Sequence, residues 1–176
     1  GDYRERYKKQ IQTEIAYHEM FHAERAHVLV VDDNEVNLKI IEGLAKRTGI
    51  QMDMTTSAKQ GLAMIRKQEY QLFLIDHMMP EMDGYEVLQH LKSNPETTDI
   101  PVIIMSALSD MQSIVKGYQL GATEYVTKPF QREELVKRVA HRYELYSIKR
   151  IKAELAQIAE CLSVRGFLGS FKAKLA

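Results

Sequence analysis

The stretch LFLIDHMMPEMDG at residues 72–84 joins an apolar run to a sharp turn. Its first four residues are apolar, Asp76 follows them, and Pro80 and Gly84 interrupt the chain soon afterwards. A short apolar run bounded by turn-forming residues is typical of a buried strand. We therefore expect a strand that stops at Asp76 and presents its carboxylate at the edge of a sheet.

Three other apolar runs lead to polar residues in the same way. Residues 28–31 precede Asp32 and Asp33, residues 102–105 precede Ser106, and residues 124–127 precede Lys128 and Pro129. The four predicted strand ends therefore supply three carboxylates, a hydroxyl and an ammonium group, which is a set of groups suited to chemistry.

Patterns typical of helices separate these strands. Helix starts are expected at Asn34, Ser57 and Asp83, and Ser109 forms a capping box with Gln112. Such an alternation of strands and helices predicts parallel strands with helices on both faces of the sheet.

With these motifs in this order, residues 27–142 resemble the receiver domain of two-component response regulators. The resemblance implies an α/β fold, a flavodoxin-like, doubly wound, five-stranded parallel sheet of strand order 2-1-3-4-5. The residues outside the resemblance predict extra helices at both ends of the chain. In this architecture ligands bind outside the carboxyl ends of the strands, where all four motifs lie.

The resemblance also implies that Asp76 accepts a phosphoryl group from a sensor histidine kinase or a phosphotransfer protein. Clustered carboxylates repel each other and the incoming group, so a cation is needed, and hard oxygen ligands favour Mg²⁺, or Mn²⁺ in its place. By resemblance, Asp33 and Asp76 bind the ion directly, Asp32 binds it through water, and the backbone carbonyl of Met78 completes the site.

Two further side chains are expected to contact the phosphoryl group, which Lys128 would pair with and Ser106 would hydrogen-bond. By resemblance, the Lys128–Pro129 peptide bond is cis, and Tyr125 is the aromatic switch that rotates inward as the Ser106 hydroxyl moves. The alternative for Tyr125 is a half-exposed strand residue without a switching role.

We expect no enzyme activity beyond self-phosphorylation from small donors and slow self-dephosphorylation. Positions 78 and 108 commonly tune hydrolysis in this family, and here they are Met78 and Leu108. Neither side chain can orient an attacking water by hydrogen bonding, so the phosphoryl group is expected to be long-lived.

The two ends of the chain lie outside the receiver pattern. Residues 1–26 predict an amphipathic helix, and residues 143–176 predict a helical extension whose regular part is closed by Gly166. The last ten residues, 167–176, could be a short amphipathic piece, a linker or a vector-derived tail. A coiled-coil seam is expected on this extension, with spacings that alternate between three and four, at Ile148, Ile151, Leu155, Ile158 and Leu162. The seam favours a homodimer, and the alternative is a helix that packs back on its own receiver or on the N-terminal helix.

Composition agrees with a cytoplasmic protein. The chain has 176 residues, 45% of them hydrophobic, and a formal net charge of zero. It lacks the roughly 18 uninterrupted apolar residues of a membrane span, and its single cysteine, Cys161, fits a reducing compartment. We expect no direct nucleic-acid binding, because no helix-turn-helix pattern follows residue 145.

The first residue is Gly rather than Met, so we expect a piece of a longer protein. Two other classes of function remain open. The chain could be the regulatory part of an enzyme, such as a cyclic-dinucleotide synthase or phosphodiesterase, or of a hybrid histidine kinase. It could also be a stand-alone adaptor whose helices bind a partner according to phosphorylation state.

Overall fold

The computed structural model describes residues 3–9, 22–107, 110–129 and 131–175, and for residues 44–45, 132 and 164–175 only the backbone. The chain divides into two compact units, Gly1–Tyr143 and Glu144–Ala176. In the first unit, five parallel strands form one sheet of order β2-β1-β3-β4-β5, as predicted. The strands are β1 (His27–Val31), β2 (Gln51–Thr55), β3 (Leu72–Asp76), β4 (Val102–Ser106) and β5 (Glu124–Thr127).

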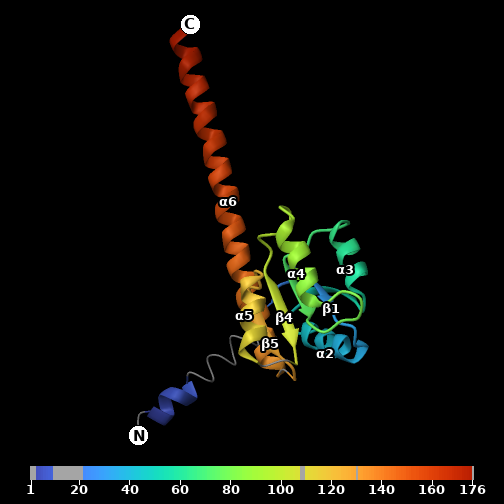
Figure 1. The fold of residues 1–176 in the computed structure, drawn as a ribbon. Coiled ribbons are helices and arrows are strands. Elements are labelled where there is room, and N and C mark those ends of the chain that lie inside the picture. Colours follow the sequence, from blue (N-terminus) through green and yellow to red (C-terminus); the bar gives the residue numbers. More distant parts are fainter. Residues whose placement is uncertain (1–2, 10–21, 108–109, 130, 176) are drawn as a thin grey trace. The chain divides into compact units, whose positions relative to one another are not determined.

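Helices cover both faces of this sheet (Figure 1). They are α2 (Glu35–Ala45), α3 (Ala58–Ile65), α4 (Gly84–Ser93), α5 (Met111–Gln119) and α6 (Arg132–Leu175). The first turns of α6 share a core with α2, while α3, α4 and α5 lie on the opposite face, where Gly61 of α3 meets Val31 and Gly117 of α5 meets Tyr85 of α4. Among the described residues, no helix combines the length and the apolar composition needed to cross a membrane.

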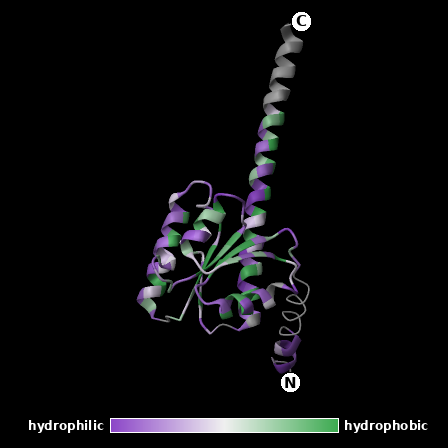
Figure 2. Cartoon of the chain, turned by 90° about the vertical axis from the view of Figure 1, so that its right-hand side faces the viewer, coloured by the Kyte–Doolittle hydropathy of each residue, from purple (hydrophilic) through white to green (hydrophobic). Residues whose placement is uncertain are grey.

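Alternation along the central strands builds the two cores, because successive side chains of a strand point to opposite faces. Val28 and Val30 of β1 and Leu72 and Leu74 of β3 join the core beneath α2 and α6, whereas Val31 faces α3. The central strands β3 and β4 are accordingly buried along their whole length, and each is apolar up to its last residue (Figure 2).

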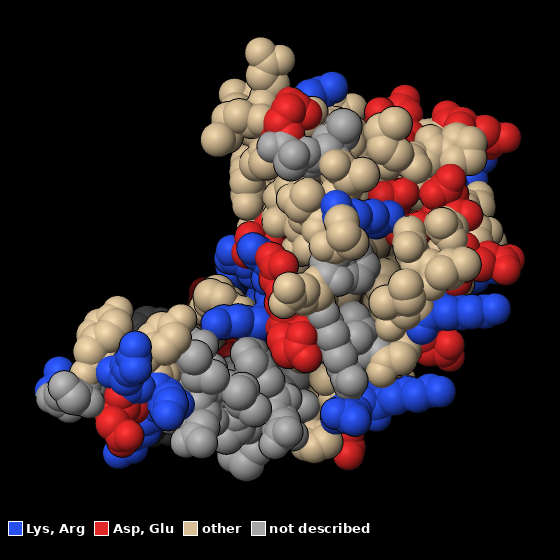
Figure 3. Space-filling model, turned by 90° about the horizontal axis from the view of Figure 1, so that it is seen from below, with Lys and Arg blue, Asp and Glu red and all other residues tan. Residues whose placement is uncertain are grey.

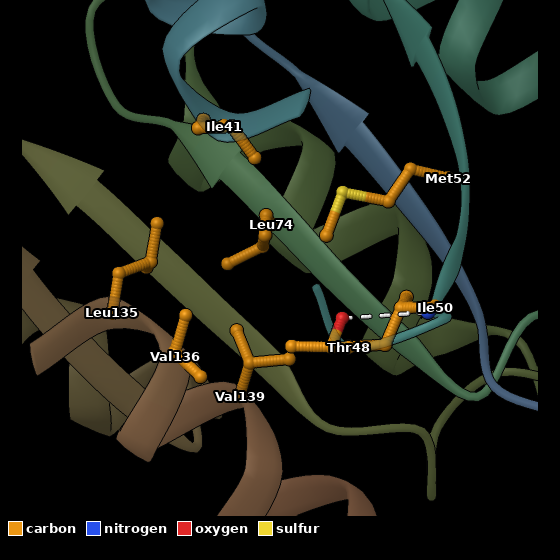
Figure 4. A pocket seen from close by; sticks show the side chains of 8 residues that line it. All are labelled: Ile41, Thr48, Ile50, Met52, Leu74, Leu135, Val136 and Val139. Carbon is orange, nitrogen blue, oxygen red and sulfur yellow. Dashed lines mark hydrogen bonds between the residues drawn. The ribbon is translucent and has the colours of Figure 1, made fainter. Parts of the chain in front are cut away.

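A small apolar cavity of about 10 Å³ remains in the core between α2, α6 and the sheet. Figure 4 shows the side chains that line it, which are Ile41, Thr48, Ile50, Met52, Leu74, Leu135, Val136 and Val139. The only polar side chain in this set, Thr48, accepts a hydrogen bond from the backbone N–H of Ile50. The lining is therefore hydrophobic, and the cavity offers no set of polar partners for a bound water.

The predicted helix starts at Asn34, Ser57 and Asp83 are confirmed, since each side chain accepts a hydrogen bond from the first turn of its helix. The capping box at Ser109 and Gln112 is wrong. Ser109 itself lies outside the described residues, and the cap of α5 is Asp110, whose carboxylate accepts from the backbone N–H of Ser113 at 2.9 Å.

Both ends of the chain differ from the sequence prediction. Residues 3–9 are helical and residues 10–21 lie outside the described part, but residues 22–26 are not helical, because Ala23 and Ala26 are buried in the receiver core. At the other end, α6 does not close at Gly166 but continues to Leu175. One glycine costs a helix only about 1 kcal/mol, and no proline follows it.

Candidate phosphoacceptor site

The register of the sheet brings the four predicted strand ends together. Val31 is paired with Ile75 in the β1–β3 ladder, so Asp32 and Asp76 follow on adjacent strands. Asp76 is paired with Met105 and Ser106 with Thr127, which carries Ser106 and Lys128 to the same edge. Ligand atoms of Asp32, Asp33 and Asp76 lie within 4.8 Å of one another.

Lys128 is the cation that contacts this cluster. Its Nζ donates to Oδ2 of Asp32 at 2.7 Å and to Oδ1 of Asp76 at 2.8 Å. Burial lowers the pKa of the Lys128 ammonium, but the hydrogen bonds to the two carboxylates outweigh burial and raise its pKa above the ordinary value. Lys128 is therefore charged at neutral pH. The Lys128–Pro129 peptide bond is cis, as expected.

Asp76 is nearly inaccessible, with 4% of its surface exposed. Burial raises the pKa of its carboxyl, Lys128 lowers it, and the negative charges of Asp32 and Asp33 raise it again, so that the pKa lies above its ordinary value. The carboxylate is thus held in an environment that favours any additional positive charge.

Asp32 is held by a residue that the sequence interpretation missed. The Nδ2 group of Asn37, in the first turns of α2, donates to both carboxylate oxygens of Asp32 at 3.0 and 3.1 Å. The backbone N–H of Asn34 donates to Oδ1 at 3.0 Å. An amide one helical turn beyond the acidic pair is the signal that could have found it. Asp33, in contrast, is exposed.

The three carboxylates fit a hard divalent cation, because they offer oxygen atoms at close range from fixed backbone positions. Asp32 is buried and oriented by Asn37, and Asp33 faces solvent, from which the waters that Mg²⁺ retains could come. Met78 is 60% exposed, and the part assigned to its backbone carbonyl remains a prediction.

His77 and Gly84, which both follow Asp76 in the sequence, shape the loop after β3. The backbone N–H of His77 donates to the carbonyl of Met105 at 2.8 Å, and the N–H of Gly84 donates to the carbonyl of His77 at 2.9 Å. A Cβ at position 84 would clash with the Asp76 carbonyl oxygen and come within 2.9 Å of His77 Cα. Only glycine therefore fits where α4 begins.

Ser106 and Tyr125 are both buried, with exposed fractions of 0% and 6%. The Ser106 Oγ lies 3.2 Å from Nδ1 of His77, a second residue that the sequence interpretation missed although it directly follows Asp76. The Tyr125 ring lies beside Tyr85 and Gly117. It is not the half-exposed strand residue of the alternative interpretation.

Leu108, the other predicted determinant of phosphoryl lifetime, lies outside the described residues. The seam residues Ile148 to Leu162 form no part of the site and belong to the second unit.

Comparison with known proteins agrees with this geometry. Residues 28–140 match the response regulator receiver domain, and the chain therefore belongs to the response regulator receiver family. It is 31% identical over 112 residues to the DNA-binding dual master transcriptional regulator RpaA of Synechocystis, covering 64% of this chain and 46% of RpaA. It is 37% identical over 116 residues to the response regulator PleD of Caulobacter vibrioides, covering 65% of this chain and 25% of PleD.

Among solved structures, the chain is similar to the BeF3-activated receiver domain of DrrB. The two share 32% sequence identity with a TM-score of 0.60, over 68% of this chain and 97% of the DrrB domain. The chain spans about half the length of RpaA and a quarter of PleD.

Proposed function

We propose that this chain is a phosphorylation-controlled switch in which Asp76 accepts a phosphoryl group from a sensor histidine kinase or a phosphotransfer protein. The observation that carries the proposal is the position of Asp76 between two other carboxylates and a charged lysine at the edge of the sheet. This arrangement offers an oxygen nucleophile together with groups that neutralise a phosphoryl group.

In the proposed transfer, one carboxylate oxygen of Asp76 attacks the phosphorus of a phosphohistidine. A P–O bond to Asp76 forms as the P–N bond breaks, and the electron pair of that bond stays with the departing imidazole. Lys128 holds Asp76 in place and pairs with a phosphoryl oxygen, and Ser106 donates a hydrogen bond to another. When bound between Asp32, Asp33 and Asp76, Mg²⁺ or Mn²⁺ supplies the charge neutralisation that three carboxylates and a phosphoryl group require.

The output of the switch is proposed to involve the surface of α5, β5 and the first turns of α6. Glu124 joins β5 to α6 through ion pairs with Arg138 at 2.6 Å and Arg142 at 2.7 Å, and the Tyr118 hydroxyl of α5 lies 3.5 Å from Oε1 of Glu124. Tyr125 follows Glu124 and packs against Gly117 of α5. Because Ser106 of β4 is paired with Thr127 of β5, a change at Ser106 can reach this surface through β5.

Pairing of two copies through the second unit is the proposed assembly. The apolar residues of the predicted seam are 49–61% exposed in the single chain, namely Ile148, Ile151, Leu155, Ile158 and Leu162. A stripe of this kind gains stability when a second helix covers it. In the proposal, residues 143–176 thus form a segment whose function, pairing of two copies, is separate from that of the receiver. The protein is proposed to be cytoplasmic.

A second candidate concerns the natural protein. RpaA is named as a DNA-binding transcriptional regulator, so a natural protein that contains this receiver could bind DNA through a separate domain. On the face of the molecule in Figure 3, acidic and basic side chains are intermingled, so this face lacks the basic patch of a DNA-binding surface. DNA binding is therefore assigned to a separate domain.

The test is binding of beryllofluoride, which mimics a phosphoryl group on the carboxylate. With Mg²⁺ present, wild type is expected to bind it with a change in amide NMR signals around residues 76, 106 and 128, and Asp76→Asn is expected to show none. Asp33→Asn should weaken Mg²⁺ binding, so that beryllofluoride binding needs a higher Mg²⁺ concentration. Glu81→Gln, at an exposed acid paired with Lys59, should leave the required Mg²⁺ concentration unchanged. Equal responses of wild type and Asp76→Asn would refute the proposal.

A further inference from the structure

We propose that His77 is a positioning residue that holds the Ser106 hydroxyl in the protein without a phosphoryl group, and so competes with the phosphoryl group for that hydroxyl. The inference deepens the proposed function and rests on Asp76 as the phosphoacceptor. It assigns a part in the switch to a side chain outside the carboxylate cluster of Asp32, Asp33 and Asp76.

The backbone of His77 is fixed at both of its polar groups. Its N–H donates a hydrogen bond to the carbonyl of Met105 in β4, and its carbonyl accepts one from the N–H of Gly84 at the start of α4. Because Asp76 is paired with Met105 in the β3–β4 ladder, the next residues on the two strands, His77 and Ser106, are also neighbours. The register of the sheet therefore brings the two side chains together.

The imidazole of His77 is enclosed rather than solvated. The residue is 7% exposed, its Nδ1 lies 3.2 Å from the Ser106 Oγ, and its ring lies against Tyr85 with 4.1 Å between ring centroids at a tilt of 31°. The Nδ1 atom is thus within hydrogen-bonding distance of the Ser106 hydroxyl, and a neutral imidazole has one donor and one acceptor nitrogen.

Competition follows from the proton count of Ser106. A serine hydroxyl carries a single proton, and a phosphoryl oxygen can only accept hydrogen bonds. If Ser106 donates this proton to Nδ1 of His77 before phosphorylation, the same proton must leave Nδ1 to reach the phosphoryl group. Each phosphorylation event then includes the exchange of one buried hydrogen bond for another.

The exchange has a path to the rest of the protein. Tyr85 packs against His77, donates from its hydroxyl to the backbone carbonyl of Ser113 in α5, and lies with Tyr125 beside Gly117 of α5. Lys116 of α5 lies 5.2 Å from the centre of the Tyr85 ring. The release of Ser106 from His77 thus alters the packing of the His77 ring against Tyr85. Tyr85 of α4 and Tyr125 of β5 lie together beside α5, so the change reaches all three elements.

The test compares two substitutions that differ in one polar atom. His77→Phe fills the space of the ring without an acceptor, whereas His77→Asn keeps an oxygen close to the position of Nδ1. In beryllofluoride titrations with Mg²⁺, His77→Phe is expected to bind roughly two- to tenfold more tightly than wild type, the equivalent of one hydrogen bond. His77→Asn is expected to restore an affinity close to wild type.

A double-mutant cycle assigns the effect to Ser106. In a Ser106→Ala background, His77→Phe should leave the affinity for beryllofluoride unchanged, because no hydroxyl remains to be held. An effect that persists in this background, or weaker binding by His77→Phe with Ser106 present, would overturn the inference. If wild type itself does not bind beryllofluoride, the proposed function fails and the inference fails with it.

A measurement on wild type alone keeps the test independent of the folding of any variant. Long-range ¹H–¹⁵N NMR of the imidazole is expected to show an unprotonated Nδ1 that accepts a hydrogen bond, with a chemical shift that moves when beryllofluoride and Mg²⁺ are added. A protonated Nδ1 in the free protein would mean that Ser106 accepts from His77 and keeps its own proton, which contradicts competition.

Discussion

The Nζ atom of Lys128 lies 2.8 Å from Oδ1 of Asp76, which joins the end of β5 to the end of β3 across the intervening strand β4. These residues are 52 positions apart in sequence. The same ammonium group contacts Asp32 of the neighbouring strand end, so a single cation bridges three of the five strand ends.

Removal of this cation should destabilise the protein when no divalent ion is present. In Lys128→Met, the buried carboxylates of Asp32 and Asp76 lose their cationic partner. A loss of about 3 kcal/mol in the free energy of unfolding is expected. Urea denaturation in the presence of EDTA measures this loss, and added Mg²⁺ should recover part of it. The matched control is Lys59→Met, whose exposed pair with Glu81 should contribute little to stability because solvent screens it. A midpoint for Lys128→Met equal to that of the control would contradict the prediction.

Asp76→Asn should change how stability depends on pH. The pKa of Asp76 is raised in the folded protein above its ordinary value of 3.8. Its contribution to stability is therefore fully present below pH 3.8 and is lost as the pH rises through the folded pKa. Without divalent ions, the variant should become more stable than wild type as the pH rises to neutrality. Thermal melts across this pH range measure the difference, and a difference that is constant with pH would argue against a raised pKa.

Leu135 in the first turns of α6 is 2% exposed and lines the small apolar cavity (Figure 4). Leu135→Ala would enlarge this cavity and remove a buried side chain, with an expected cost of about 2–5 kcal/mol in the free energy of unfolding. His141→Ala, at an exposed position of the same helix, should cost far less. Chemical denaturation of both variants provides the comparison, and similar costs would show that α6 is not anchored by this core.

The seam on the second unit is tested by charge. In the double variant Ile151→Glu and Leu155→Glu, two acidic groups replace apolar residues of the stripe. Light scattering is expected to give a dimer for wild type and a monomer for this variant. The control is Ala153→Glu with Ala156→Glu, two exposed positions that lie off the stripe and should leave the dimer intact. If the Ile151 and Leu155 variant keeps the dimer mass, another surface holds the two copies together.

The sequence alone predicted the alternation of strands and helices and the strand-end residues of the candidate phosphoacceptor site. Short apolar runs that end in polar residues predict buried parallel strands, and caps such as Asn34 and Asp83 mark helix starts through contacts with the next few residues. Both signals are local, so they survive without knowledge of the rest of the molecule. The order of Asp32, Asp76, Ser106 and Lys128 then predicts the site, because parallel strand ends meet at one edge.

Only the tertiary structure decided what surrounds those residues. The contact of His77 with Ser106 depends on the register between β3 and β4, and the contact of Asn37 with Asp32 depends on the direction in which α2 leaves the sheet. At the N-terminal side, Ala26 belongs to the core rather than to a helix, since burial against the sheet outweighs its helical propensity. Such contacts join residues through packing between elements, and a pattern along one chain carries no record of the register that packing selects.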